Sequence, residues 1–212
     1  MDLREVKKEL SKIKRTSFGI SIPEVRKFAK KLAGTQGEKF FEVNDFSSFE
    51  LKLLHAFTIG YMKGDIDILL NYFEDFIPQV DDWAVNDSLC QNFKIARKYP
   101  EKVWNFIEGH AKTQKEFESR IVSVLLLSHF LNDEYIDRVI VMLDKLYSEE
   151  YYAQMGIAWA FATIMGKYPE KCLSYLKSTD CSLDSVTLKK TYQKIRESFR
   201  VTDDVKNMLA KK

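Results

Sequence analysis

The chain is poor in residues that interrupt helices, with 8 glycines and 4 prolines among its 212 residues. An all-β protein needs turn residues at roughly every tenth position, so this scarcity argues against that class. Hydrophobic residues make up 45% of the chain and aromatic residues 13%. This content is enough for a packed core and excludes disorder as the main state. We therefore expect an all-α fold.

Cysteines and long apolar runs are also scarce. The cysteines, Cys90, Cys172 and Cys181, are odd in number and include no Cys-x-x-Cys pair. This excludes a disulfide framework and a cysteine-based zinc site, and is typical of a reducing compartment. The start of the chain is charged and has no apolar signal core. The longest apolar run, Ile121–Leu127, contains a serine and is too short to span a bilayer. The sequence predicts a cytoplasmic protein with no membrane association.

The common catalytic and cofactor motifs are missing as well. The chain has no phosphate-binding loop, no dinucleotide fingerprint, no Gly-x-Ser-x-Gly and no His-Glu-x-x-His. His55, His110 and His129 lie far apart in the sequence, and none has a carboxylate or second histidine at ligand spacing. We expect neither a metal site nor a cofactor.

The net charge is only +2, but the charges are segregated along the chain. Lys and Arg dominate residues 1–36, 91–130 and 153–212, whereas Asp and Glu dominate residues 37–90 and 131–152. A fold that gathers the three basic segments on one side would present a basic face to a polyanion. Ordinary solvated helix faces are the alternative explanation of the same pattern.

Apolar periodicity, capping residues and proline positions predict a succession of helices. The predicted helices cover residues 3–15, 23–33, 48–63, 65–76, 87–98, 100–110, 114–131, 134–146, 149–166 and 169–177, then from 182 or 184 to about 199, with a short last helix capped by Thr202. Ser47 or Ser48 and Asp65 are expected to cap helices, and Thr113 with Glu116 forms a capping-box pattern. No segment shows the strict alternation of a half-buried strand.

An internal repeat indicates how these helices are arranged. Lys-Tyr-Pro-Glu-Lys occurs at residues 98–102 and again at residues 167–171, at an offset of 69 positions. This offset equals two helix-pair units of about 35 residues, a period typical of α-solenoids of the HEAT or armadillo type. We therefore expect one HEAT-like repeat domain over residues 1–212, curved and with a concave basic face. A four-helix bundle would need fewer and longer helices.

Four side chains stand out as candidates for function on that concave face. Trp83 and Asp87 are four positions apart and share one helical face. Arg120 lies early in a helix that is otherwise strongly apolar, and Trp159 lies in the middle of another. A purely structural explanation is also open: tryptophans in the core, Asp87 as a helix cap, and Arg120 solvated or in a buried ion pair.

The order and context of these residues resemble a known family, the bacterial DNA-alkylation-repair glycosylases of the AlkD type. The resemblance extends over nearly the whole chain. It is carried by Phe18-Gly-Ile-Ser-Ile-Pro-Glu-Val-Arg, Trp83-x-x-x-Asp87-Ser, the Arg120 helix, Gly156-x-x-Trp159 and Tyr168-Pro-Glu.

The resemblance implies a curved stack of HEAT-like repeats that excises cationic alkylated purines, such as 3-methyladenine and 7-methylguanine, from double-stranded DNA. It assigns Asp87 as the catalytic carboxylate, near the sugar on which positive charge develops. Trp83 and Trp159 would pack on the sugar–phosphate, and Arg120 would bind a phosphate. No metal or cofactor is required, and we expect a monomer.

The sequence also departs from the family pattern. One helix, residues 3–15, precedes the Phe18 motif, where the glycosylases carry a helix pair. Ser21 and Ala162 stand where they carry longer polar or basic side chains. Two alternatives to an active glycosylase therefore stay open. One is a non-catalytic module that binds bent, branched or damaged DNA, and the other is a protein–protein scaffold.

Overall fold

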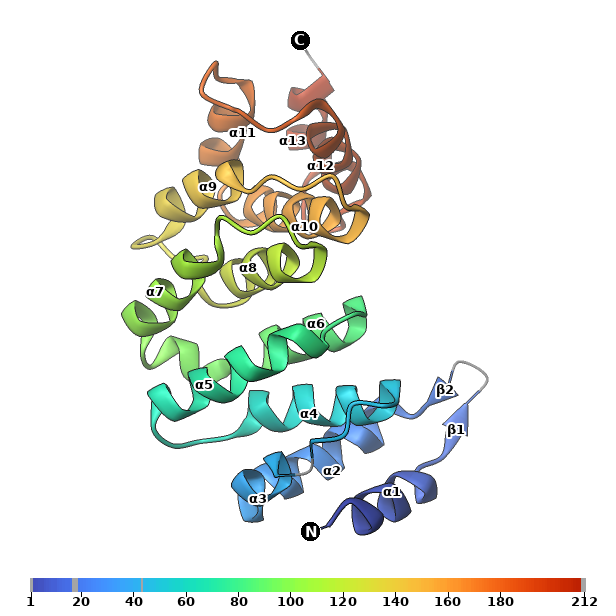
Figure 1. Cartoon of the computed structure of the whole chain (residues 1–212). Coiled ribbons are helices and arrows are strands. Elements are labelled where there is room, and N and C mark those ends of the chain that lie inside the picture. The colour runs from blue at the N-terminus through green and yellow to red at the C-terminus, as the bar shows by residue number, and fades with distance from the viewer. Residues whose placement is uncertain (1, 17–18, 43, 211–212) are drawn as a thin grey trace. The chain divides into compact units, whose positions relative to one another are not determined.

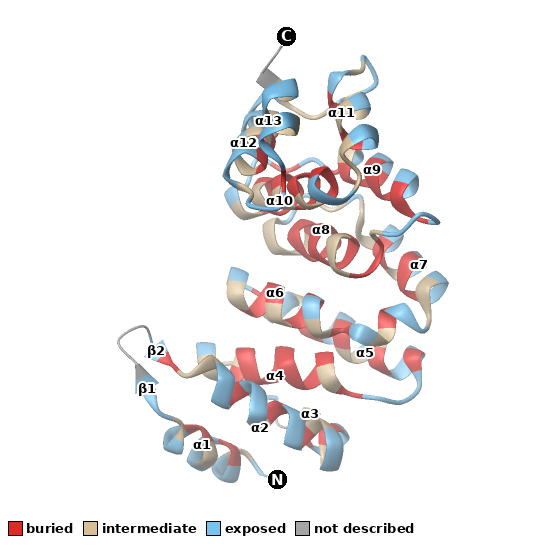
Figure 2. Ribbon diagram, turned by 180° about the vertical axis from the view of Figure 1, so that it is seen from behind, coloured by how far each residue is buried: buried red, intermediate tan, exposed pale blue. Residues whose placement is uncertain are grey.

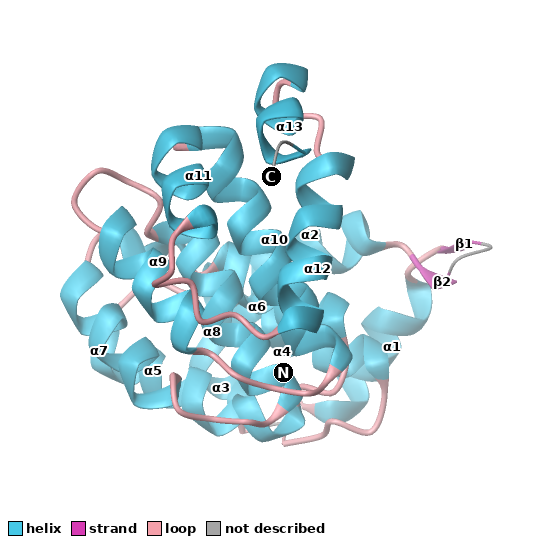
Figure 3. Ribbon diagram, turned by 90° about the horizontal axis from the view of Figure 1, so that it is seen from above, coloured by secondary structure: helices cyan, strands magenta, loops and turns pink. Residues whose placement is uncertain are grey.

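The computed structural model describes residues 2–16, 19–42 and 44–210, and the chain divides into two compact units, Met1–Val103 and Trp104–Lys212 (Figure 1). Helices dominate both units (Figure 3). In each unit, every second helix packs side by side with the next one of the same row, as in a repeat solenoid. The predicted all-α repeat fold is confirmed.

The first unit is built around the helix α4. The elements of this unit are α1 (Leu3–Lys12), β1 (Arg15–Thr16), β2 (Gly19–Ile20), α2 (Ile22–Thr35), α3 (Gly37–Phe41), α4 (Phe49–Tyr61), α5 (Ile66–Phe76), η1 (Ile77–Gln79), α6 (Trp83–Asn92) and η2 (Lys94–Arg97). The helices α2, α4 and α6 pack side by side with α4 in the middle, and α3 and α5 lie beside this row (Figure 1). Most residues of α4 are buried, so this helix forms the centre of the unit.

A glycine lets α4 and α6 approach each other closely. A Cβ atom added to Gly60 would lie 2.7 Å from the Cβ of Asn92 and 3.1 Å from its carbonyl carbon. Real Cβ atoms do not approach other atoms so closely. The spacing of these two helices therefore depends on the missing side chain at position 60.

The second unit repeats this plan around α10. The helix α7 (Pro100–His110) runs from the first unit into the second, and the elements that follow it are α8 (Glu116–His129), α9 (Ile136–Lys145), α10 (Tyr151–Lys167), α11 (Pro169–Lys177), α12 (Ser185–Glu197) and α13 (Asp203–Ala210). The helices α8 and α12 pack on either side of α10, which is buried along most of its length (Figure 2).

The two Lys-Tyr-Pro-Glu-Lys segments occupy equivalent loop-to-helix junctions. Their prolines begin α7 and α11. The last lysine of each segment makes an ion pair with the second residue of the preceding helix of the same row. Lys102 Nζ lies 2.5 Å from Asp67 Oδ2, and Lys171 Nζ lies 2.6 Å from Asp137 Oδ1. The repeat inferred from the sequence is therefore also a repeat of contacts.

Further contacts recur at the repeat distance. Ser148 Oγ donates to the carbonyl of Gln114, 34 residues earlier, at 3.2 Å. The backbone N–H of Tyr152 donates to the carboxylate of Glu116, 36 residues earlier, at 2.7 Å. These bonds tie consecutive helix pairs of the second unit to each other, as expected for a solenoid with a period of about 35 residues.

Several predicted helix starts are confirmed by their capping bonds. Ser48 accepts from the N–H of Leu51, and Asp65 accepts from the N–H of Asp67. Asp184, one of the two predicted starts, accepts from the N–H groups of two residues in the first turn of α12. Side-chain oxygens at these positions satisfy donors that the helix leaves unpaired.

Some helix starts were predicted incorrectly. The helix predicted at 87–98 begins at Trp83, because Asp82 accepts from the N–H of Ala84 at 2.7 Å. The helix predicted at 114–131 begins at Glu116. Thr113 accepts there from the N–H of Lys115 and forms a turn before the helix rather than a capping box.

The segment between the first two predicted helices contains a short β-ribbon. β1 and β2 pair antiparallel, with Arg15 opposite Ile20 and Thr16 opposite Gly19. Gly19 has a φ of 108°, which a residue with a side chain rarely adopts. Phe18, with which the quoted motif begins, lies outside the described residues. Within the described residues, no helix combines the length and apolarity needed to cross a membrane.

Candidate functional site

Trp83 and Asp87 lie one turn apart at the beginning of α6, in the first unit. Trp83 is the first residue of the helix, and its side chain is 50% exposed. Asp87 is only 9% exposed, on a helix whose Asn86 and Leu89 are fully buried. The pair therefore combines an indole that a ligand can reach with a carboxylate that is largely shielded from water.

This placement removes two of the structural explanations. Trp83 is not a core residue, since half of its surface is exposed. Asp87 is not a helix cap, because Asp82 has that role and Asp87 lies inside the helix. A carboxylate at low exposure also interacts more strongly with a nearby positive charge, because water screens the interaction less.

Arg120 and Trp159 come together in the second unit. Arg120 is 6% exposed, and its Nη1 donates to the carbonyl of Tyr152 at 3.1 Å. Its guanidinium carbon lies 6.0 Å from the ring centre of Tyr152 and 6.0 Å from that of Trp159. The half-buried Trp159 and the charge of Arg120 are thus within the range of a cation–π interaction.

The close packing of α8 on α10 makes this pairing possible. A Cβ on Gly156 would lie 3.3 Å from Cγ of Arg120 and 3.3 Å from Cβ of Ser123. The missing side chain at position 156 leaves room for the arginine stem beside α10. Gly156 is the glycine of the Gly-x-x-Trp motif, and its lack of a side chain therefore lets Arg120 lie beside Trp159.

Further basic and aromatic residues, which the sequence did not predict, lie beside Arg120 and Trp159. The rings of Tyr151 and Tyr152 meet edge to face at 5.2 Å, and Lys190 Nζ from α12 lies 4.6 Å from the ring centre of Tyr151. Lys190 also donates to the side-chain oxygen of Gln154. We refer to Arg120, Tyr151, Tyr152, Trp159 and Lys190 as the cation–aromatic cluster.

Part of this cluster had a sequence signal. Tyr152 and Trp159 are seven positions apart on one helix, so they lie two turns apart on the same face. No sequence pattern pointed to Lys190. Its contact with Tyr151 on α10 depends on how α12 packs against α10, which the sequence does not show.

The first unit has its own pairs of cations and rings. The guanidinium carbon of Arg26 lies 5.1 Å from the ring centre of Phe57, and Lys30 Nζ lies 5.1 Å from that of Tyr61. Both basic residues are exposed on α2, one turn apart. Burial raises the pKa of Tyr61, so this phenol stays neutral beside the basic residues. These contacts show that part of the basic segment at residues 1–36 is ordered against α4.

His55 and His110 lie in different surroundings. His55 lies among aromatic rings, with its ring centre 4.3 Å from that of Phe40, while His110 Nδ1 lies 2.8 Å from Glu118 Oε1. Across residues 2–16, 19–42 and 44–210, no three His, Cys, Asp or Glu side chains form a group that could hold a metal ion.

The four residues predicted from the sequence thus form two local pairs, one in each unit. Trp83 and Asp87 share α6, and Arg120 contacts Trp159. Their convergence on one surface stays a prediction.

An all-α repeat fold with an exposed indole, a shielded carboxylate and cations placed over aromatic rings has side-chain chemistry typical of nucleic-acid-binding proteins. The comparisons with known proteins identify the family. A family model described as DNA alkylation repair enzyme matches residues 4–195. The chain belongs to this family, so its role is in DNA repair and its substrate is DNA. Comparisons with curated proteins and with solved structures gave no match.

Proposed function

We propose that this protein is a DNA glycosylase that removes purines alkylated at N3 or N7 from double-stranded DNA. The observation that carries the proposal is the pair on α6, in which the shielded carboxylate of Asp87 lies one turn from the exposed indole of Trp83. Family membership indicates DNA as the substrate. The carboxylate and the indole are groups suited to cleaving a glycosidic bond and to packing on DNA.

The alkylated purine is already cationic, so it leaves as a neutral base without prior protonation. As the glycosidic bond breaks, its electron pair moves to the purine and positive charge develops on the sugar. The carboxylate of Asp87 stabilises that charge, and it orients a water molecule and accepts its proton as the water attacks the sugar. The products are a free alkylpurine and an abasic site. No step needs a metal or a cofactor.

The remaining predicted residues bind the substrate. The indoles of Trp83 and Trp159 pack on the sugar–phosphate backbone, and the positive charge of Arg120 attracts a phosphate. Lys190 and Tyr151 extend this contact along α10 and α12. Basic residues of α2 add affinity that does not depend on sequence but falls with salt.

The test is release of an abasic site from duplex DNA carrying 7-methylguanine, with the Asp87→Asn variant beside the wild type. This substitution keeps the size of the side chain and removes its charge. We expect the rate to fall by about 100- to 1,000-fold, or ~3–4 kcal/mol, while duplex affinity stays nearly unchanged. Asp75→Asn, at an exposed carboxylate on α5, is the control and should keep full activity.

A non-catalytic DNA-binding module is the second candidate. Ala162 favours it, because this residue is buried on α10 one turn after Trp159 and projects no cationic side chain toward a substrate. Wild-type protein that binds methylated duplex but releases no purine above the spontaneous rate would select this candidate. Full activity in Asp87→Asn would instead remove Asp87 from the mechanism.

A further inference from the structure

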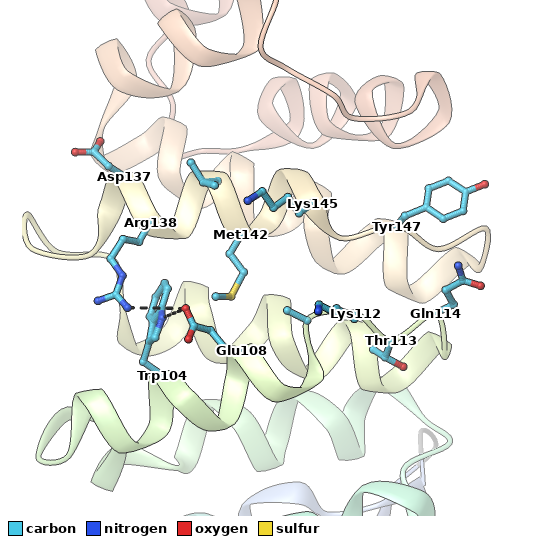
Figure 4. Close-up of a pocket in the computed structure, with 12 residues that line it drawn as sticks. Trp104, Glu108, Lys112, Thr113, Gln114, Asp137, Arg138, Met142, Lys145 and Tyr147 are labelled. Carbon is cyan, nitrogen blue, oxygen red and sulfur yellow. Dashed lines mark hydrogen bonds and ion pairs between the residues drawn. The ribbon is translucent and has the colours of Figure 1, made fainter.

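The second unit contains a groove between α7 and α9, in the helix row that does not carry the cation–aromatic cluster (Figure 4). Its volume is about 740 Å³, within the range of small-molecule binding sites. Residues of α7 and α9 form the two walls, and the loops that follow these helices form one end.

At one end of the groove, polar groups of opposite charge contact one another. The indole N–H of Trp104 donates to Oε1 of Glu108 at 2.7 Å, and Nη2 of Arg138 lies 4.0 Å from the same oxygen. The Arg138 guanidinium carbon also lies 4.2 Å from a ring centre of Trp104. The negative charge of Glu108 is thus matched by Arg138, and these three side chains together carry no net charge.

The middle of the groove is apolar. Met142 points from α9 toward α7 and is 9% exposed, whereas Val141 beside it is 48% exposed. Ala111 completes this part of the lining. An exposed valine beside a partly covered methionine offers a surface for an apolar ligand body.

Two lysines that line the groove carry uncompensated positive charge. Lys112 follows α7 and Lys145 is the last residue of α9, and both are exposed. In the described part of the chain, neither makes an ion pair or a side-chain hydrogen bond. The remaining acidic residue of the lining, Asp137, is bound to Lys171 at 2.6 Å and points away from the groove (Figure 4).

The loop end of the groove is held in place. The Ser148 hydroxyl donates to the carbonyl of Gln114, which ties the loop after α9 to the loop after α7. Tyr147, beside this serine, is among the residues at this end of the lining, and its hydroxyl donates to Glu149 at 2.9 Å. The hydrogen bond from Ser148 therefore fixes the loop that carries Lys112 relative to the loop after α9.

We propose that this groove binds a small amphipathic organic anion, with its apolar body against Val141 and Met142 and its carboxylate, sulfonate or phosphate between Lys112 and Lys145. The charge of the neighbouring surface disfavours a long polyanion. The next groove of this row, between α9 and α11, is lined by Asp137, Glu170 and Asp180 against the single cation of Lys171. Its carboxylates would repel an extended phosphate backbone.

The probe for the test is anilinonaphthalene sulfonate, which combines aromatic rings with one sulfonate. Calorimetry on the wild-type chain should show one site. A variant carrying Lys112→Gln and Lys145→Gln should bind the dye about tenfold more weakly, because two charge-assisted contacts are lost. The control carries Lys94→Gln and Lys189→Gln, which change the net charge equally at exposed lysines outside the groove and should leave affinity unchanged. An equal loss in both variants would overturn the proposal.

Two further measurements locate the dye. Val141→Glu places a carboxylate on an exposed position of the wall and should abolish binding. The methyl resonance of Met142, assigned by its loss in Met142→Leu, should shift during the titration. An unmoved resonance, several dye molecules per chain, or displacement of the dye by duplex DNA would each overturn the proposal. None of these outcomes depends on glycosylase activity.

Discussion

The guanidinium carbon of Arg120 lies 6.0 Å from the ring centre of Trp159, although the two residues belong to different helix pairs. The bond from Nη1 to the carbonyl of Tyr152 and the close approach of α10 at Gly156 help to hold Arg120 there. Arg120 is thus positioned by its own unit before DNA binds. This relationship leads to the first prediction.

Arg120→Ala should weaken binding to duplexes of any sequence and lower the salt dependence by about one phosphate contact. Arg120→Lys should keep most of the salt dependence, because the charge remains, but lose the bond to Tyr152. Duplex affinity measured across a range of salt concentrations distinguishes the two. If Arg120→Ala left the slope of affinity against salt unchanged, Arg120 would not contact a phosphate.

Lys190 and Lys189 are neighbours on α12 with different surroundings. Lys190 lies over the Tyr151 ring, whereas Lys189 is exposed and contacts no member of the cation–aromatic cluster. We expect Lys190→Gln to weaken duplex binding and Lys189→Gln to change it little. Equal effects would mean that α12 contributes only general positive charge.

The stability of the first unit should depend strongly on Gly60. Gly60→Ala forces the backbones of α4 and α6 apart, since the new Cβ would lie 2.7 Å from the Cβ of Asn92. We expect a loss of ~1–3 kcal/mol in the free energy of unfolding. Gly34→Ala in α2 is the control. No atom lies within 4 Å of that Cβ, and the higher helix propensity of alanine should stabilise the chain by ~0.5–1 kcal/mol. Urea unfolding measures both.

Asp184 should make stability depend on pH in the acid range. Partial burial tends to raise the pKa of Asp184, but hydrogen bonds from Thr187 and Val186 outweigh it and hold the pKa below its ordinary value. A depressed pKa contributes stability that is present above the unfolded-state pKa of about 3.9 and lost as the pH falls through the folded-state value.

Asp184→Asn keeps a capping oxygen and should remove that part of the acid sensitivity. Asp184→Ala removes the cap and should cost ~1 kcal/mol at neutral pH as well. Urea unfolding from about pH 6 to about pH 2 tests both variants. An unchanged acid profile in Asp184→Asn would contradict the assignment.

The cysteines should differ in reactivity. Burial, reinforced by Cys181, raises the pKa of Cys172 to about 12, so its thiol stays protonated and inert at pH 8. Burial also raises the pKa of Cys181, but this side chain is half-exposed. A colorimetric disulfide reagent should therefore label Cys181 first, and Cys181→Ser should leave no rapidly reacting thiol in the folded chain. Fast labelling of Cys172 would contradict its burial.

Much of the helical layout could be predicted from the sequence, because its causes are local. Ser48 and Asp65 cap helices with their own side chains, and the prolines of both Lys-Tyr-Pro-Glu-Lys segments begin helices. The exact start of α6 could not be chosen in the same way. Asp82 and Asp87 are both capable of capping, and only the packing against α4 leaves Asp87 inside the helix.

The sequence by itself determined the helix pairs, their period, the family resemblance and the identities of four candidate residues, because these follow from local patterns and residue order. Only the tertiary structure decided that Trp83 is exposed while Asp87 is shielded, that Arg120 reaches Trp159, and that Lys190 joins them. Exposure and contacts between helices depend on which faces pack together and how closely. That closeness is set by side-chain volumes at positions such as Gly60 and Gly156, which no helical period reveals.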